Sequence, residues 1–232
     1  MPEWNVKLKD KIERTSDITS FRFDTPEDLS YLPGQFFFIY IPSEVEGSMM
    51  HHFSFSSSPS ETYIEFTTRI RDSPFKKRLN QLKIGTIIKI ASVSGQFTIT
   101  EAMEKIVFAC GGIGITAARS NIKWILDSHS NIDLILLYGN RDSNNIAFKD
   151  ELEHISKENF KIFHILSNPE ESWDGPKGFI NAEFISSSVL DLTERIWFIS
   201  GPPGMVKSIK DILTTVLNIP EGRIRTENYV GY

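Results

Sequence analysis

The chain has 232 residues, of which 40% are hydrophobic and 24% charged, and its formal net charge is -5. This length favours two domains over one, and the negative charge argues against nucleic acid as the main partner. A single cysteine excludes an internal disulfide and the four-thiolate ligand set of an iron–sulfur cluster. The longest apolar runs are far shorter than the roughly 20 residues of a membrane-spanning helix, and the start lacks the apolar segment of a signal peptide. We therefore expect a cytoplasmic protein without a membrane span.

In roughly the first 100 residues, apolar side chains recur at every second position, which is the period of a β-strand. Val6 and Leu8 are one such pair. Turn sequences such as YLPGQ and LKIGT separate the short strands, at the spacing of a small antiparallel barrel or sandwich. A single helix is predicted in this half, within SPFKKRLNQL at residues 73–82, because its apolar residues follow the helical period.

The stretch HHFSFSSSPS, residues 51–60, combines two adjacent histidines with five serines. A polar loop accounts for the serines and the proline. The histidines could suggest a metal, but no further His, Cys, Asp or Glu follows them at a metal-ligand spacing. The sequence therefore predicts no metal site here.

The segment 69–89 is strongly basic, with seven Lys or Arg residues against the single acid Asp72, a charge of +6. We expect this segment to face water or an anionic ligand. A solvated strand edge guarded by charge is an equally good interpretation. The basic residues are Arg69, Arg71, Lys76, Lys77, Arg78, Lys83 and Lys89.

From about residue 104, apolar strands alternate with helical segments, beginning with KIVFAC and TAARSNIKWILDS and ending with RIWFIS and MVKSIKDILTTVL. This alternation predicts right-handed crossovers and a doubly wound parallel sheet. In the last helix, Val206, Ile209, Leu213 and Val216 are expected on one face. We place the domain boundary so that residues 1–101 form the barrel and 102–232 the α/β domain.

Two loops follow strands of the predicted sheet. In the loop CGGIGITAARS, Gly112, Gly114 and Ala117 form the pattern G-x-G-x-x-A, with which backbone amides and a helix N-terminus approach a pyrophosphate. The loop ISGPPGMVKS, residues 199–208, also lies between a strand and a helix, although a stiff turn alone would explain its prolines. Because both loops end strands of one sheet, they favour a shared ligand.

The third predicted loop of interest is GNRDSNN, which follows the strand LILLY. An acid in this place would hold the ribose hydroxyls of NAD, whereas an arginine would suit the extra phosphate of NADP. Both Arg141 and Asp142 are present. The sequence leaves the choice between the two dinucleotides open.

The order of these motifs resembles the ferredoxin–NADP reductase superfamily. GQF and an aromatic–Ser–x–x–Ser–Ser–Pro run lie in the first half, GGIGIT and GPPGM in the second, and the chain ends in E-x-aromatic-x-G-Y. The resemblance covers nearly the whole chain. It implies FAD bound by the barrel and NADH or NADPH bound by the α/β domain.

In the family pattern R-x-(Tyr or Phe)-(Ser or Thr), the aromatic ring packs against the flavin and the hydroxyl reaches the flavin N5. The resemblance assigns these roles to Phe53 and Ser54, and it puts His51 where the family usually has an Arg facing the FAD pyrophosphate. The family's second phosphate-contacting segment aligns with RDSPFKKRL, which could replace that arginine. The implied flavin-binding residues are His51, His52, Phe53, Ser54, Ser73, Phe75 and Lys76.

In the second half, the resemblance lays the NAD(P)H pyrophosphate over residues 111–116. It places Glu227 in the polar end of the site and Tyr232 on the flavin face, as a gate for the nicotinamide. Ser200 stands where the family often has Cys, and Ala117 where it often has Pro. The implied dinucleotide-binding residues are Gly111, Gly112, Gly114, Ile115, Thr116, Arg141, Gly201, Pro202, Met205 and Tyr232.

The resemblance implies an oxidoreductase that takes hydride from NAD(P)H onto bound FAD and passes electrons to a protein acceptor such as ferredoxin or flavodoxin. Ser54, Glu227 and Tyr232 are its implied catalytic residues. An NAD(P)H:flavin reductase that uses free flavin as substrate is one alternative. A non-catalytic electron-transfer subunit of a larger complex is another.

Overall fold

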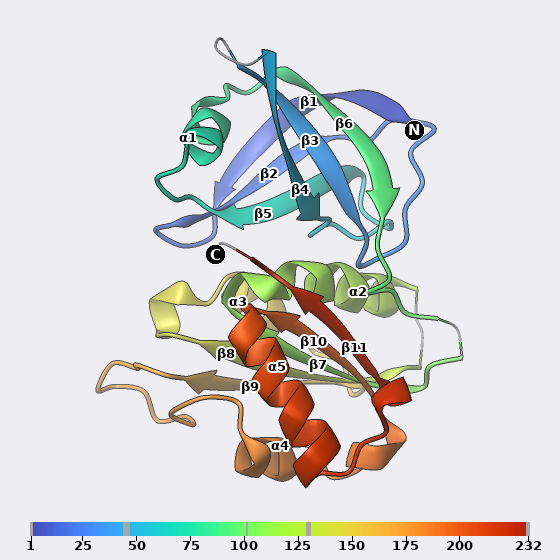
Figure 1. Ribbon diagram of the computed structural model, residues 1–232, viewed down its shortest axis with the longest axis vertical. Coiled ribbons are helices and arrows are strands. Elements are labelled where there is room, and N and C mark those ends of the chain that lie inside the picture. Colours follow the sequence, from blue (N-terminus) through green and yellow to red (C-terminus); the bar gives the residue numbers. More distant parts are fainter. Residues whose placement is uncertain (1, 44–46, 101, 129–130, 231–232) are drawn as a thin grey trace. The chain divides into compact units, whose positions relative to one another are not determined.

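The computed structural model describes residues 2–43, 47–100, 102–128 and 131–230. The chain divides into two compact units (Figure 1). Unit 1 comprises Met1–Thr98 and Arg119–Ser128, and unit 2 comprises Ile99–Ala118 and His129–Tyr232. The predicted boundary between residues 101 and 102 stays a prediction. Within the described ranges, no helix has the length and apolar character that crossing a membrane requires.

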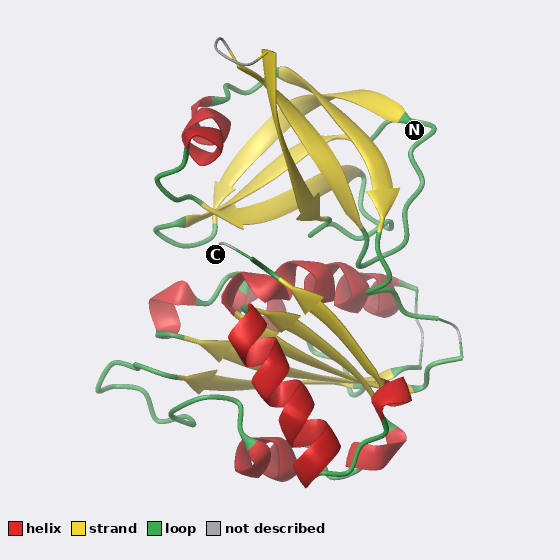
Figure 2. Cartoon of the chain, viewed as in Figure 1, coloured by secondary structure: helices red, strands yellow, loops and turns green. Residues whose placement is uncertain are grey.

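Unit 1 contains a six-stranded antiparallel sheet in the order β4-β3-β6-β1-β2-β5. Figure 2 distinguishes its strands, in yellow, from the helices and loops. A bridge between Phe55 and Phe66 joins the chain just after β4 to β5 at the other end of this order. The amide of Ser56 also donates to the carbonyl of Glu65 at 2.8 Å. These contacts close the sheet into a barrel. The strands are β1 (Glu3–Glu13), β2 (Ile18–Asp24), β3 (Phe36–Ser43), β4 (Gly47–Ser54), β5 (Tyr63–Arg69) and β6 (Ile87–Ser94).

The barrel core confirms the predicted period of two, because Val6 and Leu8 on β1 are fully buried. Helix α1 (Pro74–Gln81) begins where Ser73 caps it and proline occupies its first turn, a position that needs no amide donor. Phe75 and Leu79 of this helix are buried in the barrel core.

Unit 2 contains a five-stranded parallel sheet in the order β11-β10-β7-β8-β9. Helices α4 and α5 pack their apolar side chains on the same core as strands β7 and β10. The predicted barrel followed by a doubly wound parallel sheet is therefore confirmed. The strands are β7 (Lys105–Gly111), β8 (Asp133–Asn140), β9 (Phe160–Leu166), β10 (Ile196–Gly201) and β11 (Ile224–Asn228), and the helices are α2 (Ile115–Asp127), α3 (Lys149–Glu153), α4 (Ala182–Ser188) and α5 (Pro203–Asp211).

The last helix differs from the prediction. It is α-helical only to Asp211 and continues as a π-helical turn, Ile212–Val216. Val206, Ile209 and Leu213 are buried as expected, but Val216 is 57% exposed. A π-turn holds more residues than an α-turn and so rotates the positions that follow. This rotation moves Val216 off the predicted apolar face.

The serine-rich turn after β4 is held by residues of α2 that belong to unit 1. Arg119 is 2% exposed and donates to the carbonyl of Ser56 at 2.7 Å and to Glu61 at 2.6 Å. Ser120 donates to the carbonyl of Ser57 at 2.6 Å. The turn thus satisfies its buried carbonyls with fixed donors, which keeps the end of β4 in one conformation.

A buried carboxylate, Glu65 on β5, ties three parts of the barrel together. It is 0% exposed and pairs with Arg14 Nη2 at 3.1 Å and with Arg22 Nε at 2.7 Å. It also accepts a hydrogen bond from the Ser56 hydroxyl at 2.9 Å. The carboxylate therefore links β2, the end of β1 and the turn that follows β4.

We expect Glu65→Gln to lower the free energy of unfolding of the barrel by about 3 kcal/mol, because breaking a buried ion pair leaves charge without its partner. Glu3→Gln is the matched control. Glu3 pairs with Lys89 at 3.1 Å on the surface, where such a pair contributes at most about 1 kcal/mol. Urea unfolding followed by tryptophan fluorescence measures both, and equal midpoints for the two variants would contradict this account of the barrel.

Candidate functional site

The His51–Ser54 run forms the last half of β4, and its side chains alternate between the two faces of the barrel wall. His51 and Phe53 lie opposite Ile39 and Phe37 of β3, both of which are buried. Phe53 is 4% exposed, and its ring stacks on Phe66 at 4.4 Å and on His51 at 4.9 Å. The ring predicted to pack against a flavin is therefore part of the barrel core in this structure.

His52 points to the other face of the same strand. Its ring is exposed and lies 5.5 Å from Phe36 and 5.8 Å from Phe38, between ring centroids. Among the other predicted flavin-binding residues, it is the His51 ring that His52 contacts, at 5.5 Å between ring centroids. Ser54 at the end of the strand is 6% exposed and pairs with Phe36 in the sheet register.

The first turn of α1 adds three more of the predicted residues. The Ser73 hydroxyl accepts a hydrogen bond from the Lys76 amide at 3.2 Å. The Phe75 ring lies 5.2 Å from the His51 ring. The Lys76 ammonium donates to the Thr68 hydroxyl on β5 and lies 4.5 Å from the centroid of the Phe53 ring. Strands β4 and β5 and helix α1 thus bring His51, Phe53, Ser73, Phe75 and Lys76 into one cluster, which we call the α1 cluster.

The α1 cluster corrects one expectation about the basic segment. Lys76 is only 7% exposed, so it does not face water as the other basic residues were expected to do. Its alkyl chain is drawn inward because the helical position beside Phe75 faces the barrel core. Burial and the neighbouring charge of Arg71 lower the pKa of Lys76 to about 7.

The polar groups of the α1 cluster are the ammonium of Lys76, the hydroxyl of Ser73 and the imidazole of His51. The ammonium and the hydroxyl are groups that suit a pyrophosphate, whereas the Nδ1–H of His51 already donates to the His52 carbonyl. Thr68, which is fully buried and bonds to Lys76, is a neighbour of the cluster that sequence reasoning missed. Its signal was weak, because a threonine in a strand is the ordinary choice for a half-buried position.

In unit 2, the loops after β7 and β10 are packed against each other. A Cβ atom on Gly114 would lie 2.3 Å from the Ser200 carbonyl oxygen, and one on Gly111 would lie 2.2 Å from the sulfur of Met205. Gly112 has a φ of +50°, and a Cβ there would meet nothing within 4 Å. The structure thus leaves open space beside Gly112, where a backbone amide and a ligand phosphate can approach closely.

The contacts of Ser200 and Thr116 fix the two loops further. The Ser200 hydroxyl donates to the Gly114 carbonyl at 2.8 Å and lies 3.4 Å from Cys110 Sγ. Burial raises the pKa of the Cys110 thiol to about 12, which keeps it protonated. The Thr116 hydroxyl lies 2.9 Å from the hydroxyl of Tyr229. Tyr229 is the aromatic residue of the E-x-aromatic-x-G-Y ending, to which the sequence assigned no contact.

The remaining predicted residues of unit 2 lie along the same edge of the sheet. Glu227 on β11 is the register partner of Ser200 on β10. Ile115 is fully buried at the start of α2, and Pro202 precedes the first residue of α5. Arg141 is exposed just after β8. Tyr232 lies outside the described residues.

The sequence also missed Asn140, the last residue of β8. Its side-chain amide is buried, and neither Oδ1 nor Nδ2 has a hydrogen-bond partner among the described residues. An unsatisfied buried amide is costly. Its position at the carboxyl edge of the sheet, next to the glycine loops, is where a dinucleotide would supply the missing partners.

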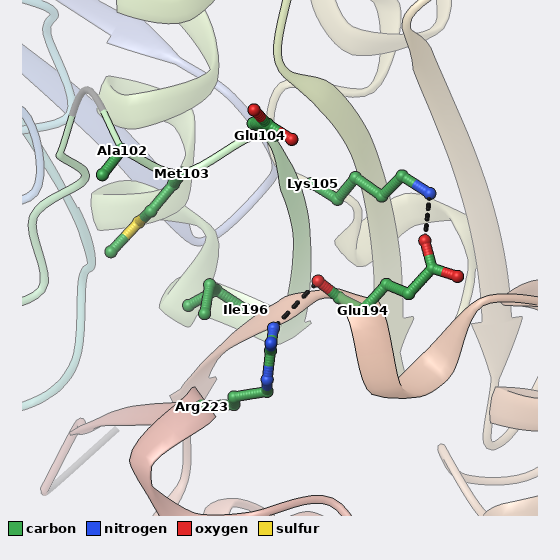
Figure 3. A pocket seen from close by; sticks show the side chains of 7 residues that line it. All are labelled: Ala102, Met103, Glu104, Lys105, Glu194, Ile196 and Arg223. Carbon is green, nitrogen blue, oxygen red and sulfur yellow. Dashed lines mark hydrogen bonds and ion pairs between the residues drawn. The ribbon is translucent and has the colours of Figure 1, made fainter.

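A pocket of about 570 Å³ lies elsewhere in unit 2 (Figure 3). Its lining includes Lys105 and Ile196, which begin β7 and β10, so it lies at the amino ends of strands whose carboxyl ends carry the glycine loops. No predicted site residue lines it. Across the part of the chain that the structure describes, no group of three or more His, Cys, Asp or Glu residues could hold a metal ion.

Two family models match the chain, one in each half. The oxidoreductase FAD-binding domain matches residues 5–99, and the oxidoreductase NAD-binding domain matches residues 108–211. The FAD-binding match includes the α1 cluster, and the NAD-binding match includes the two glycine loops.

Among curated proteins, the chain is 29% identical over 221 residues to the glycine betaine monooxygenase reductase subunit of Chromohalobacter salexigens, covering 90% of this chain and 60% of that protein. It is 30% identical to NADH-cytochrome b5 reductase 1 of Aspergillus terreus, covering 89% and 75% of the two chains. Among solved structures, a ferredoxin NADP+ reductase from Neisseria gonorrhoeae with bound FAD and NADP superposes with a TM-score of 0.83 at 19% identity, covering 98% and 99%. The chain thus spans about 60% of the length of the glycine betaine monooxygenase reductase subunit.

Gly114→Ala is expected to lower the free energy of unfolding of unit 2 by about 1–3 kcal/mol, because the new methyl group overlaps the Ser200 carbonyl and the loops must separate. Gly204→Ala is the control, since a Cβ there meets nothing within 4 Å and alanine favours a helix by about 0.5–1 kcal/mol. Thermal unfolding distinguishes them. A Gly114→Ala chain as stable as Gly204→Ala would show that the loops are not in contact.

Proposed function

This chain belongs to the ferredoxin–NADP reductase superfamily, and we propose that it oxidises NAD(P)H on bound FAD and passes the electrons to a redox protein acceptor. The family models make the chain an oxidoreductase with FAD-binding and NAD-binding domains. The observation that carries the proposal is the pair of glycine loops at the edge of the parallel sheet, packed so closely that a Cβ on Gly111 or Gly114 would overlap the facing loop.

The residues of unit 1 would bind and orient the flavin. FAD supplies hydride acceptance and electron release when it is bound. The α1 cluster offers a cation and hydroxyls to the pyrophosphate, and Ser54 offers a hydroxyl to the flavin N5. Phe53 would support the flavin ring from the barrel side, after a rearrangement that uncovers part of its buried ring. His52 stays a predicted flavin-binding residue, with its ring beside that of His51.

The residues of unit 2 would bind and orient NAD(P)H. Backbone amides at Gly112–Thr116 face the pyrophosphate, and the buried amide of Asn140 supplies further hydrogen bonds. Ser200 and Glu227, neighbours across β10 and β11, form the polar end of the nicotinamide site. Because Asp142 would suit NADH and Arg141 would suit NADPH, both dinucleotides stay candidates. Tyr232 is proposed as a gate for the nicotinamide.

The proposed electron acceptor is a redox protein with an acidic surface, such as a ferredoxin or flavodoxin. Within the basic segment, Arg71, Lys77 and Lys83 are exposed and could attract such a protein. Relatives named as a glycine betaine monooxygenase reductase subunit and as an NADH-cytochrome b5 reductase support a protein acceptor. A cytoplasmic location is part of the same proposal.

Purification tests the proposal against its rivals. The chain is expected to elute from gel filtration as a yellow protein and to oxidise NADH or NADPH. A colourless chain that reduces added riboflavin would instead identify a free-flavin reductase. A chain that oxidises neither nucleotide, with or without added FAD, would leave the electron-transfer subunit and exclude the reductase.

Ser54→Ala is expected to slow the bleaching of the FAD-loaded chain by NAD(P)H roughly three- to tenfold, the effect of one lost hydrogen bond of about 1 kcal/mol. Ser48→Ala is the control, because Ser48 is an exposed serine on the same strand. Stopped-flow absorbance under anaerobic conditions measures the rate. Equal rates for the two variants would remove Ser54 from the site.

A further inference from the structure

The proposed function does not use the pocket of about 570 Å³ in unit 2. Its lining residues lie at the amino ends of three neighbouring strands, just before or at the start of β7, β10 and β11 (Figure 3). The glycine loops follow the opposite, carboxyl ends of β7 and β10. A volume of this size is within the range of small-molecule sites. The pocket therefore offers unit 2 a second place where a small molecule can bind.

Arg223, in the short turn before β11, is the cation of this pocket that has no acid of its own. The residue is half-buried, and its Nη1 donates to the backbone carbonyl of Glu194 at 2.9 Å. Among the described residues, no carboxylate forms an ion pair with it. Arginine stays charged at neutral pH, and its planar fork of N–H groups matches the two oxygens of a carboxylate. The contact with Glu194 thus holds a charged guanidinium in place and leaves most of its N–H groups for a ligand.

The second cation of the pocket, Lys105, is already shared between two acids. Its ammonium lies 2.8 Å from Asp191 Oδ2 and 2.5 Å from Glu194 Oε2. Two carboxylates and one ammonium carry a net negative charge, and the exposed Glu104 adds another carboxylate to the lining. These acids repel a dianion more strongly than a monoanion. A ligand with a single negative charge, in contact with Arg223, therefore suits the pocket best.

Two apolar side chains complete the part of the lining that a ligand would contact. Met103 is 7% exposed, and Ile196 at the start of β10 is half-buried. Figure 3 shows both side chains on the side of the pocket away from the ammonium of Lys105. Methionine adapts its shape to the molecule that it packs against, and its sulfur favours contact with aromatic rings. An aromatic ring can therefore lie on these two residues.

From these contacts we propose that the pocket binds a small aromatic monocarboxylate. Arg223 donates hydrogen bonds to both carboxylate oxygens, and the ring of the ligand lies on Met103 and Ile196. The site is separate from the proposed flavin and dinucleotide sites, because no residue assigned to either of them lines this pocket. Binding at this pocket does not depend on the proposed function.

The test is titration of the purified chain with benzoate, followed through the backbone amide signals of its NMR spectrum. Benzoate is expected to shift the amides of residues 102–105 and 223 and to bind with a millimolar dissociation constant, because so small a ligand makes few contacts. Benzamide has the same shape without the charge, and phenyl phosphate is a dianion. Both should bind about tenfold more weakly or worse. Saturation with FAD and NAD+ should leave the benzoate affinity unchanged.

Two variants and a matched control locate the bound benzoate. Arg223→Met is expected to weaken benzoate binding about tenfold or more, because it removes the charge-assisted hydrogen bonds. Ala102→Trp should block the pocket with an indole ring while the guanidinium stays in place, since Ala102 is an exposed residue of the lining. Arg225→Met is the control. Arg225 lies on β11 and does not line the pocket, so its loss should leave benzoate binding unchanged.

Equal affinities for benzoate and benzamide would overturn the role of Arg223. Benzoate binding that survives both Arg223→Met and Ala102→Trp, or that FAD or NAD+ displaces, would place the ligand elsewhere and overturn the site. So would the absence of amide shifts in the unaltered chain at the highest soluble benzoate concentration. If Arg223→Met does not fold, Ala102→Trp and the comparison with benzamide decide the matter. None of these results bears on the proposed function, which the oxidation of NAD(P)H tests separately.

Discussion

The structure of the barrel depends on one buried carboxylate. Glu65 joins Arg14, Arg22 and the hydroxyl of Ser56, and its own backbone carbonyl accepts the amide that closes the barrel after β4. These contacts fix the position of the end of β4. The last residues of β4 therefore face β5 and the start of α1. His51 and Phe53 on β4 thereby become neighbours of Phe75 and Lys76 on α1, which lie much further along the chain. The electrostatics of the proposed flavin site follow from this closure.

In unit 2 the constraint is different: the backbones of the loops that follow β7 and β10 approach each other closely. Gly114 packs on the Ser200 carbonyl, and Ser200 donates back to Gly114. The two loops hold each other in place, because atoms of the β10 loop fill the space that a side chain on Gly111 or Gly114 of the β7 loop would occupy. This packing leaves the region beside Gly112 open, and the buried amide of Asn140 has no hydrogen-bond partner in the described part of the chain. An unsatisfied buried amide is costly, and under the proposed function a bound dinucleotide would supply its partners.

Much of this could be predicted from the sequence, because strand alternation and glycine loops are local signals. Apolar residues that recur every two or every 3.6 residues predicted the barrel and the alternation of strands and helices. The order of the motifs predicted the family. The burial of Lys76 could not be predicted, since it depends on which face of α1 meets the barrel. The exposure of Val216 depends on a π-turn that has no sequence signature. Strand β11 and helix α4 were not predicted, because each is short and gains its stability from the sheet beside it.

The proposed function requires this chain to transfer hydride from a nicotinamide dinucleotide to its bound flavin. The most direct measurement is anaerobic stopped-flow bleaching of the FAD-loaded chain by NADH and by NADPH, each with hydrogen or deuterium at either face of nicotinamide C4. We expect bleaching that slows when one face carries deuterium and not when the other does. Absence of bleaching with both nucleotides, or rates that are the same for every label, would exclude this hydride transfer.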